Sequence, residues 1–164
     1  MRTLDQLRIA VVAGDEREQE IARLAAASGA RVRAYGFPWP EDGVEGVELA
    51  PDAAAALEGA DYALFPIPGI AADGSLFAPV APAPIVPTAE LLSGLADGAA
   101  IILGMADDGL RAAAGEHGIA LVEYEDDREL MMLRAPAIVE GALQRAIEVT
   151  DITLHDAPVV VVGY

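Results

Sequence analysis

The sequence contains no cysteine and no lysine, because its ten basic residues are all arginine. The missing cysteines exclude disulfide bonds, thiolate catalysis and metal sites built from thiolates. The missing lysines exclude a phosphate-binding loop with its Gly-Lys pair, a Schiff-base enzyme and a phosphorylation receiver with its lysine switch. No apolar run approaches the roughly 20 residues that a membrane-spanning helix requires.

Acidic residues outnumber basic residues by 27 to 10, which gives a net charge of −17 at pH 7. Such a chain repels nucleic acids and anionic membranes over most of its surface, so we expect neither as a partner. It also repels anionic small molecules unless arginines are gathered at one place. The N-terminal segment has a charge inside its apolar stretch and no cleavage site of small residues, so we expect no signal peptide and a cytoplasmic location.

Apolar runs alternate with helical stretches along the chain. The runs that predict strands span residues 8–12, 31–35, 60–67, 99–103 and 119–123. A short helix is predicted over 126–133, and a linker helix from about Pro136 to Val149, with Pro136 in its first turn. This alternation predicts a three-layer α/β protein with a mostly parallel, five-stranded sheet of the flavodoxin or Rossmann type. The turn dipeptide Asp73-Gly74 predicts a small hairpin insertion.

The turn after the first predicted strand reads Gly14-Asp15-Glu16-Arg17. Ligands of open parallel sheets bind at the carboxyl ends of the strands, where helix N-termini also favour anions. Arg17 can bind a carboxylate through two parallel hydrogen bonds, so this turn is the best candidate binding site. A plainer interpretation is that Asp15 and Glu18 form the capping box of the next helix and that Arg17 pairs with a neighbouring carboxylate.

Two further positions are candidates for substrate binding. Gly69 ends the segment 66–69, which leaves the third predicted strand at the same edge and either shapes a pocket wall or simply ends the strand. Glu140 lies one turn into the predicted linker helix, where the helix dipole favours a carboxylate. It is either solvated or placed at an interdomain cleft, where it can orient an amine or assist proton transfer. The two histidines lack ligand spacing, so no metal site is predicted, and no residue is identified as the catalytic acid or base.

Three stretches taken together resemble the N-terminal half of the A subunit of dipicolinate synthase, a family of sporulation enzymes that make pyridine-2,6-dicarboxylate. They are RIAVVAGDERE from Arg8, FPIPGIAADGSLFAP from Phe65 and VEGALQRAIEVTDITLHDAPVVVVGY from Val139. The similarity covers essentially the whole chain. One departure is Glu18, because the family usually has glutamine after this turn.

The resemblance implies an oxidoreductase with the two-domain architecture of the 2-hydroxyacid dehydrogenases. Residues 1–150 would form the domain that closes over a dicarboxylate substrate, and residues 151–164 would begin a second domain that holds NADP. Gly163 would be the first glycine of its G-x-G-x-x-G loop, so we expect this chain to be inactive by itself. The implied reaction is oxidation of a dihydrodipicolinate-level intermediate in partnership with the B subunit of dipicolinate synthase, and we expect a homo-oligomer.

The run of valines at 159–162 reads as a buried strand. If it belongs to the second domain, we expect it to be disordered or paired with another chain. A different class of function also stays open, namely a freestanding flavodoxin-like module that regulates or binds a small molecule without catalysis. Codons for Gly-x-x-Gly directly after Tyr164 would favour the enzyme, and a stop codon there would favour the module.

Overall fold

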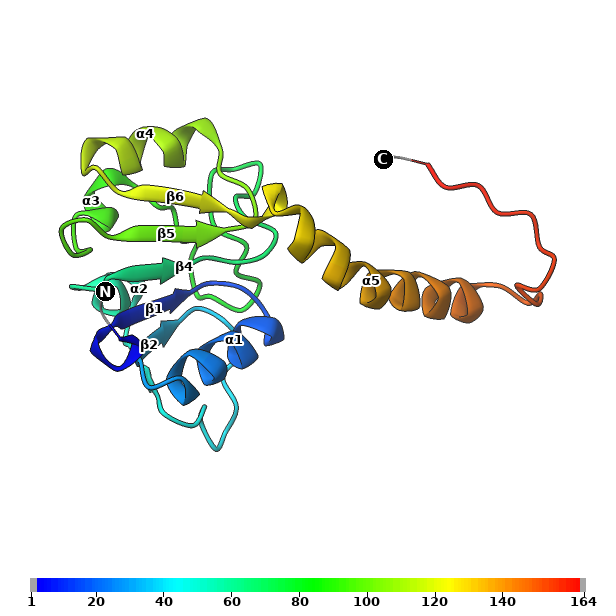
Figure 1. Ribbon diagram of the computed structural model, residues 1–164, viewed down its shortest axis with the longest axis horizontal. Coiled ribbons are helices and arrows are strands. Elements are labelled where there is room, and N and C mark those ends of the chain that lie inside the picture. The colour runs from blue at the N-terminus through cyan, green and yellow to red at the C-terminus, as the bar shows by residue number, and fades with distance from the viewer. Residues whose placement is uncertain (1–2, 163–164) are drawn as a thin grey trace. The chain divides into compact units, whose positions relative to one another are not determined.

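The computed structural model describes residues 3–162 and divides into an α/β unit that ends at Tyr124 and a helical unit that begins at Glu125. The strands of the α/β unit are β1 (Arg8–Val12), β2 (Arg31–Tyr35), β3 (Val47–Leu49), β4 (Tyr62–Leu64), β5 (Ala100–Leu103) and β6 (Ala120–Glu123). They form one six-stranded sheet in the order β3-β2-β1-β4-β5-β6, and all neighbouring strands are parallel (Figure 1). The predicted α/β class with a parallel sheet is therefore confirmed.

The strand β3 was not predicted, because the sequence-based assignment gave its residues no helix or strand. β3 has only three residues and pairs with β2 alone, at the edge of the sheet. Two of its three side chains are exposed. A strand this short has no measurable periodicity, so the neighbouring β2 determines its conformation.

The helices are α1 (Glu16–Ala27), α2 (Ala53–Leu57), α3 (Ala89–Leu92), α4 (Asp108–Glu116) and α5 (Arg128–Val149), and short 3-10 turns occupy Leu4–Gln6 and Tyr124–Asp126. Alternate residues of β1 point to opposite faces of the sheet, so Val11 packs with Ala22 of α1 while Ala10 joins the core on the other face. That second core includes Leu57 of α2, Leu92 of α3 and Leu110 of α4. Helices on both faces of a parallel sheet give the predicted three layers.

The predicted hairpin insertion is present in a minimal form. A single antiparallel bridge joins Ile70 and Leu76. Between them, Asp73 Oδ1 accepts hydrogen bonds from Ser75 N at 3.0 Å and from Ser75 Oγ at 2.6 Å. The insertion is connected to β1 because the Phe77 carbonyl accepts a 2.7 Å hydrogen bond from Gly14 N.

The helical unit corrects the predicted boundaries of the linker helix. α5 is continuous from Arg128 to Val149, begins at the N-cap Asp127, whose side chain accepts from Leu130 N, and contains Pro136 in its interior. Proline is common in a first helical turn, but an earlier cap decides where this helix starts, and the proline costs one backbone hydrogen bond. Glu140 consequently lies near the middle of α5, where the terminal dipole effect assumed for it does not reach.

The segment after α5 contains no strand among the residues that the structure describes. Val159–Val162 is unassigned, and its side chains are 73–92% exposed. Gly163 lies outside the described residues, so its predicted place in a nucleotide-binding loop stays a prediction. Within residues 3–162, no helix combines the length and the apolar character needed to cross a bilayer.

Candidate functional site

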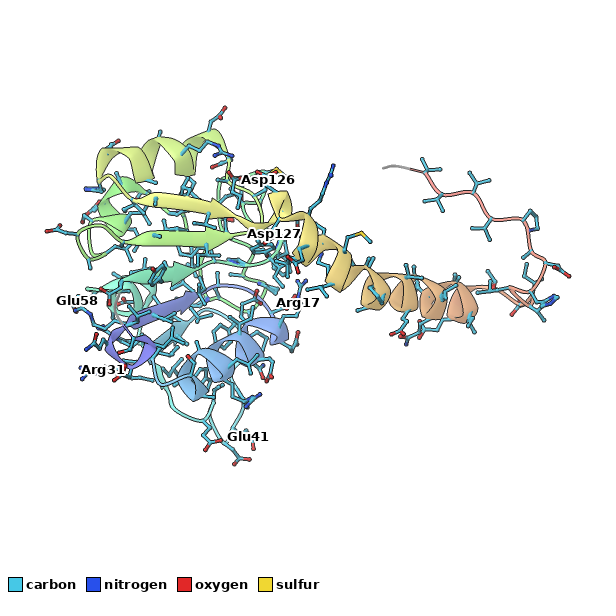
Figure 2. The ribbon with its side chains drawn as sticks, viewed as in Figure 1. Arg17, Arg31, Glu41, Glu58, Asp126 and Asp127 are labelled. Atoms are coloured by element: carbon cyan, nitrogen blue, oxygen red, sulfur yellow. The ribbon has the colours of Figure 1, made fainter. Side chains whose placement is uncertain are left out.

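The strand order places a topological switch point between β1 and β4. The chain runs from β1 outward through β2 to β3, and then returns to β4 on the other side of β1. The loops that leave β1 and β4 therefore diverge at the carboxyl edge, and open α/β sheets bind ligands in such a crevice. Figure 2 shows Arg17 at this edge, on the side toward which the strand arrows point.

The turn that leaves β1 holds two consecutive residues in the left-handed region of backbone space. Ala13 has φ 69° and Gly14 has φ 108°. Ala13 N donates to Tyr35 O and Gly14 N donates to Phe77 O, both at 2.7 Å. A non-glycine residue in this region costs free energy and persists only when its surroundings fix it, which is common at functional sites. An alanine gives no sign of this conformation, so the sequence could not reveal it.

Asp15 caps α1 as the sequence predicted. Its Oδ1 accepts from Arg17 N at 3.0 Å, and Glu18 Oε2 accepts from Asp15 N at 2.7 Å, which completes the capping box. The box satisfies backbone N–H groups that the first turn of a helix otherwise leaves without partners. The plainer interpretation of Asp15 is thus confirmed.

Arg17 binds Asp15 through two side-chain hydrogen bonds. Arg17 Nε lies 2.8 Å from Oδ1 and Nη2 lies 2.7 Å from Oδ2, with the Arg17 side chain 49% exposed. The hydrogen bond from Arg17 is the main cause that lowers the pKa of Asp15 to about 2, and the same bond raises the pKa of Arg17. A guanidinium has five N–H donors, and this pair uses two of them, so the exposed remainder can bind a second carboxylate.

Glu18 also belongs to the candidate site, although the sequence predicted it only as a capping residue. Its side chain is buried, and burial raises the pKa of its carboxyl group. Glu18 Oε1 accepts from Ile67 N at 3.4 Å, so the residue links the turn after β1 with the segment after β4. A Cβ atom at position 14 would collide with the Glu18 carboxyl group, which explains the glycine there.

Gly69 brings the loops after β4 and β5 into backbone contact. It has φ 72°, and a Cβ atom on it would lie 2.5 Å from Met105 O. Gly104 permits a second close approach, because a Cβ atom there would collide with Ile67 O. Phe77 N donates to Gly69 O at 3.3 Å, and Phe77 O accepts from Gly14 N, so Gly69 and Gly14 border the same insertion. Gly69 therefore permits the close approach of these two loops, and its role in substrate binding stays a prediction.

A second ion pair at the carboxyl edge was not predicted. Arg111 Nη2 in α4 lies 2.7 Å from Glu123 Oε2 at the end of β6. Glu123 Oε1 accepts from Ala106 N at 2.7 Å, and this backbone hydrogen bond is the main cause that lowers the pKa of Glu123. Both arginines described at this edge are therefore paired with carboxylates.

The structure thus brings four predicted residues to one edge of the α/β unit. Gly14, Asp15, Arg17 and Gly69 all lie at the carboxyl edge of the α/β unit. Glu140 is exposed and belongs to the helical unit. Among residues 3–162, no group of three or more His, Cys, Asp or Glu side chains is arranged to hold a metal ion.

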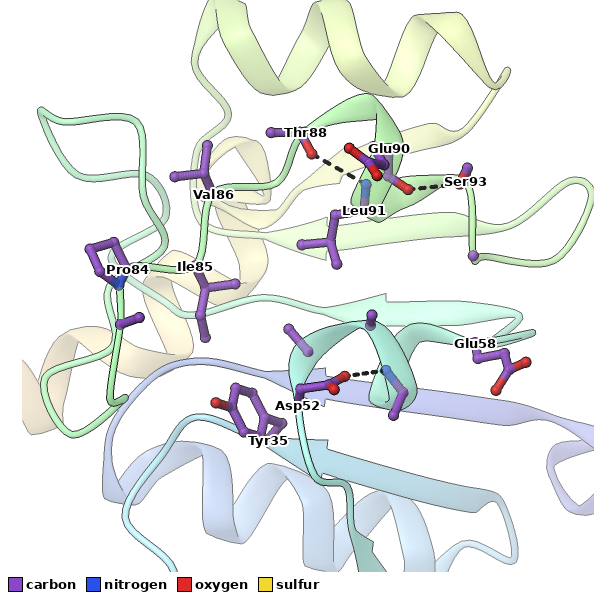
Figure 3. A pocket seen from close by; sticks show the side chains of 15 residues that line it. Tyr35, Asp52, Glu58, Pro84, Ile85, Val86, Thr88, Glu90, Leu91 and Ser93 are labelled. Atoms are coloured by element: carbon purple, nitrogen blue, oxygen red, sulfur yellow. Dashed lines mark hydrogen bonds between the residues drawn. The ribbon is translucent and has the colours of Figure 1, made fainter.

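A groove of about 830 Å³ lies between α2 and the segment that leads into α3 (Figure 3), and its lining includes Tyr35 at the carboxyl end of β2. Ile85 and Leu91 contribute apolar side chains, and the carboxylates in its lining are Asp52, Glu58 and Glu90. Asp52 caps α2 by accepting from Ala55 N at 2.7 Å. The described residues that line the groove include no arginine, so its charge is unsuitable for a dicarboxylate.

A family model described as the N-terminal domain of the dipicolinate synthase A subunit matches residues 8–125. The A subunit of dipicolinate synthase from Bacillus halodurans is 22% identical, with a TM-score of 0.79 over 93% of this chain and 52% of that chain. The A chain of dipicolinate synthase from Bacillus subtilis is 25% identical, with a TM-score of 0.70 over 90% of this chain and 49% of that chain. The resemblance found in the sequence is confirmed.

The fold is also similar to that of dehydrogenases. D-lactate dehydrogenase from Aquifex aeolicus, solved in complex with NAD and lactic acid, is 18% identical, with a TM-score of 0.54 over 83% of this chain and 40% of that chain. No curated protein matches the chain. The chain spans about half the length of the two dipicolinate synthase structures.

Proposed function

The chain belongs to the family of N-terminal domains of the dipicolinate synthase A subunit, and on this premise we propose that it is the substrate-side domain of a nicotinamide-dependent oxidoreductase. The proposed reaction converts a dihydropyridine dicarboxylate to pyridine-2,6-dicarboxylate during sporulation. The substrate loses a hydride and a proton, and the ring becomes aromatic. A nicotinamide cofactor, NADP in our proposal, would supply the hydride acceptor when it is bound by a second domain.

The observation that carries this proposal is the position of Arg17 at the switch point of a sheet whose family model matches residues 8–125. Arg17 is held by Asp15, and its remaining N–H donors are exposed. We assign these donors to one carboxylate of the substrate, and the turn fixed by Gly14 and Glu18 holds the guanidinium in place. Asp15 stays ionised at neutral pH because its pKa is about 2.

The described residues contain no G-x-G-x-x-G loop, so they do not fit a dinucleotide. The task of this chain in the proposed reaction is to bind and orient the dicarboxylate and to balance its charge. We also propose the B subunit of dipicolinate synthase for the partner, together with a homo-oligomeric assembly and a cytoplasmic location. These extensions rest on the family membership and on the composition of the chain.

The binding role is tested by titrating the 164-residue protein with pyridine-2,6-dicarboxylate in a calorimeter. We expect Arg17→Gln to weaken binding by about tenfold or more, since a bidentate charged contact is lost. The matched control is Arg23→Gln, because Arg23 lies in the same helix and also pairs with a carboxylate, that of Glu20. Equal affinities of the wild type and Arg17→Gln would contradict the assignment.

The enzymatic role is tested by joining this chain to a nucleotide-binding domain of a dipicolinate synthase A subunit and adding a nicotinamide cofactor and the partner protein. We expect turnover by that assembly and none by the 164-residue protein alone. Tight binding of NADP to the 164-residue protein would contradict the assignment of the cofactor to a second domain.

A further inference from the structure

Three of the ten arginines lie together at the amino edge of the sheet, opposite the site described above. We call Arg8, Arg31 and Arg33 the amino-edge cluster. Arg8 opens β1 and Arg31 opens β2, and these two residues are register partners on adjacent parallel strands. Figure 2 shows Arg31 at the edge of the sheet opposite to Arg17. In a chain with a net charge of −17, such a concentration of positive charge calls for an explanation.

The three side chains share one face of the sheet. Val32 and Ala34 of β2 belong to the core on the α1 side, so Arg31 and Arg33 point to the opposite face, where α2 lies. On β1, Ile9 packs against the core on the α1 side, so Arg8 points to the same face as Arg31 and Arg33. Arg8 packs near the end of α2. Adjacent strands are about 4.8 Å apart, so Arg8 and Arg31 project two like charges from neighbouring backbone positions on the same face, and these charges repel each other where no counter-ion offsets them.

The guanidinium group of Arg33 is held in place by backbone carbonyls, whereas that of Arg8 lies near a carboxylate. Arg33 Nη1 donates to Ala55 O at 2.5 Å and Nη2 donates to Glu58 O at 2.9 Å, at the carboxyl end of α2. Arg8 lies against Gly59, where a Cβ atom would come within 2.7 Å of its Nη1. Arg8 Nε also lies 3.6 Å from Asp61 Oδ2. Each guanidinium retains further N–H donors beyond these contacts.

The cluster surrounds a cavity of about 370 Å³. Its lining includes all three arginines, Glu48, Ala56 and Ala60. Glu48 is the register partner of Arg33 on β3, so Glu48 and Asp61 offset part of the charge and one positive charge is left over. The volume lies near the lower end of the range of about 300–1,000 Å³ that small-molecule sites occupy.

We propose that the amino-edge cluster binds a small oxyanion of the phosphate type, at a site distinct from the carboxyl edge. The planar guanidinium groups of Arg8 and Arg31 can each donate two parallel hydrogen bonds to two oxygens of a phosphate. Arg33 supplies a third positive charge, whose position is fixed. The bound ion would relieve the repulsion between Arg8 and Arg31. The ligand is either free inorganic phosphate or the phosphate group of a small ester.

The proposal is tested on the 164-residue protein by calorimetric titration with inorganic phosphate at constant ionic strength, with chloride as the reference anion. We expect saturable binding by the wild type and affinities lower by about tenfold or more in Arg31→Gln and Arg8→Gln. Arg23→Gln serves as the control, and it should bind phosphate as the wild type does. Wild-type affinity in Arg31→Gln would overturn the proposal, as would an equal response to chloride.

Thermal unfolding with and without phosphate shows whether Arg31→Gln changes phosphate binding or the folding of the protein. Phosphate binding by Arg17→Gln shows whether the ion binds at the amino edge or at the carboxyl edge. Without phosphate, Arg31→Gln should unfold at the same temperature as the wild type or higher, because one like charge is gone. With phosphate, the wild type should become the more stable protein.

Arg17→Gln should retain phosphate binding. Loss of phosphate binding in this variant would place the ion at the carboxyl edge and overturn the proposal. A small phosphate ester that competes with phosphate supports the ester as a ligand, whereas binding of succinate alone would overturn the phosphate class.

Discussion

The two edges of the sheet hold arginine in different ways. At the carboxyl edge, Arg17 is neutralised by Asp15 within a turn that is fixed by a capping box and by buried Glu18. At the amino edge, Arg33 is bound by two backbone carbonyls, and Arg31 lies exposed beside Arg8. The carboxyl edge is therefore rigid with its charge paired, and the amino edge presents charge that is only partly balanced.

The largest difference between the edges should appear at their glycines. Gly69→Ala should lower the free energy of unfolding by about 3 kcal/mol or more, because φ is positive and the new Cβ meets the backbone oxygen of Met105. Gly59→Ala should cost only about 1–2 kcal/mol, because the new Cβ meets the mobile end of Arg8. Urea unfolding of both variants gives the comparison. Equal costs would mean that the carboxyl edge is no more rigid than the amino edge.

The next effect concerns the carbonyls that Arg33 binds at the end of α2. Arg33→Gln should destabilise the protein by about 1–2 kcal/mol, because charged hydrogen bonds to Ala55 O and Glu58 O are lost. Arg31→Gln is the matched variant on the same strand and should show no such loss. Chemical denaturation in phosphate-free buffer measures both, and an unchanged stability of Arg33→Gln would show that these bonds contribute nothing.

The buried Glu18 predicts a pH dependence that the amino edge does not share. Because burial raises its pKa in the folded state, protonation of Glu18 favours folding, and that contribution is lost as the pH rises through the folded pKa. Above the ordinary value of 4.5, the wild type should therefore lose stability relative to Glu18→Gln as the pH increases. Urea unfolding of both proteins from pH 4.5 to 8 tests this, and parallel profiles would contradict it.

The smallest effect is expected for the exposed pair of Arg17 and Asp15. Arg17→Gln should cost about 1 kcal/mol or less at pH 7, as is usual for surface ion pairs. The lowered pKa of Asp15 stabilises the fold above its ordinary value of 3.8, and this contribution disappears as the pH falls toward about 2. The difference in free energy of unfolding between the wild type and Arg17→Gln should therefore disappear as the pH falls from 3.8 toward about 2. An NMR titration of Asp15 should show its pKa moving back toward 3.8 in the variant, and an unmoved pKa would argue against the pair.

The sequence determined the local features of this protein. Alternating apolar and helical segments predicted a parallel sheet covered on both faces, and the Asp-x-x-Glu pattern predicted the capping box at Asp15 and Glu18. Both depend on residues close together in the chain, so periodicity and short-range spacing reveal them. The expected location of the candidate site followed from the rule that ligands bind open sheets at the carboxyl ends of strands, and it stays a prediction.

Only the tertiary structure decided the features that join distant segments. Buried Glu18 accepts a hydrogen bond from the backbone of Ile67, 49 positions away, and the left-handed turn at Ala13 is hydrogen-bonded to Tyr35 and to the insertion. Arg8 and Arg31 become neighbours because β1 and β2 pair in one register among several that the sequence allowed. Strand order and register depend on packing across the whole sheet, so no local pattern contains them.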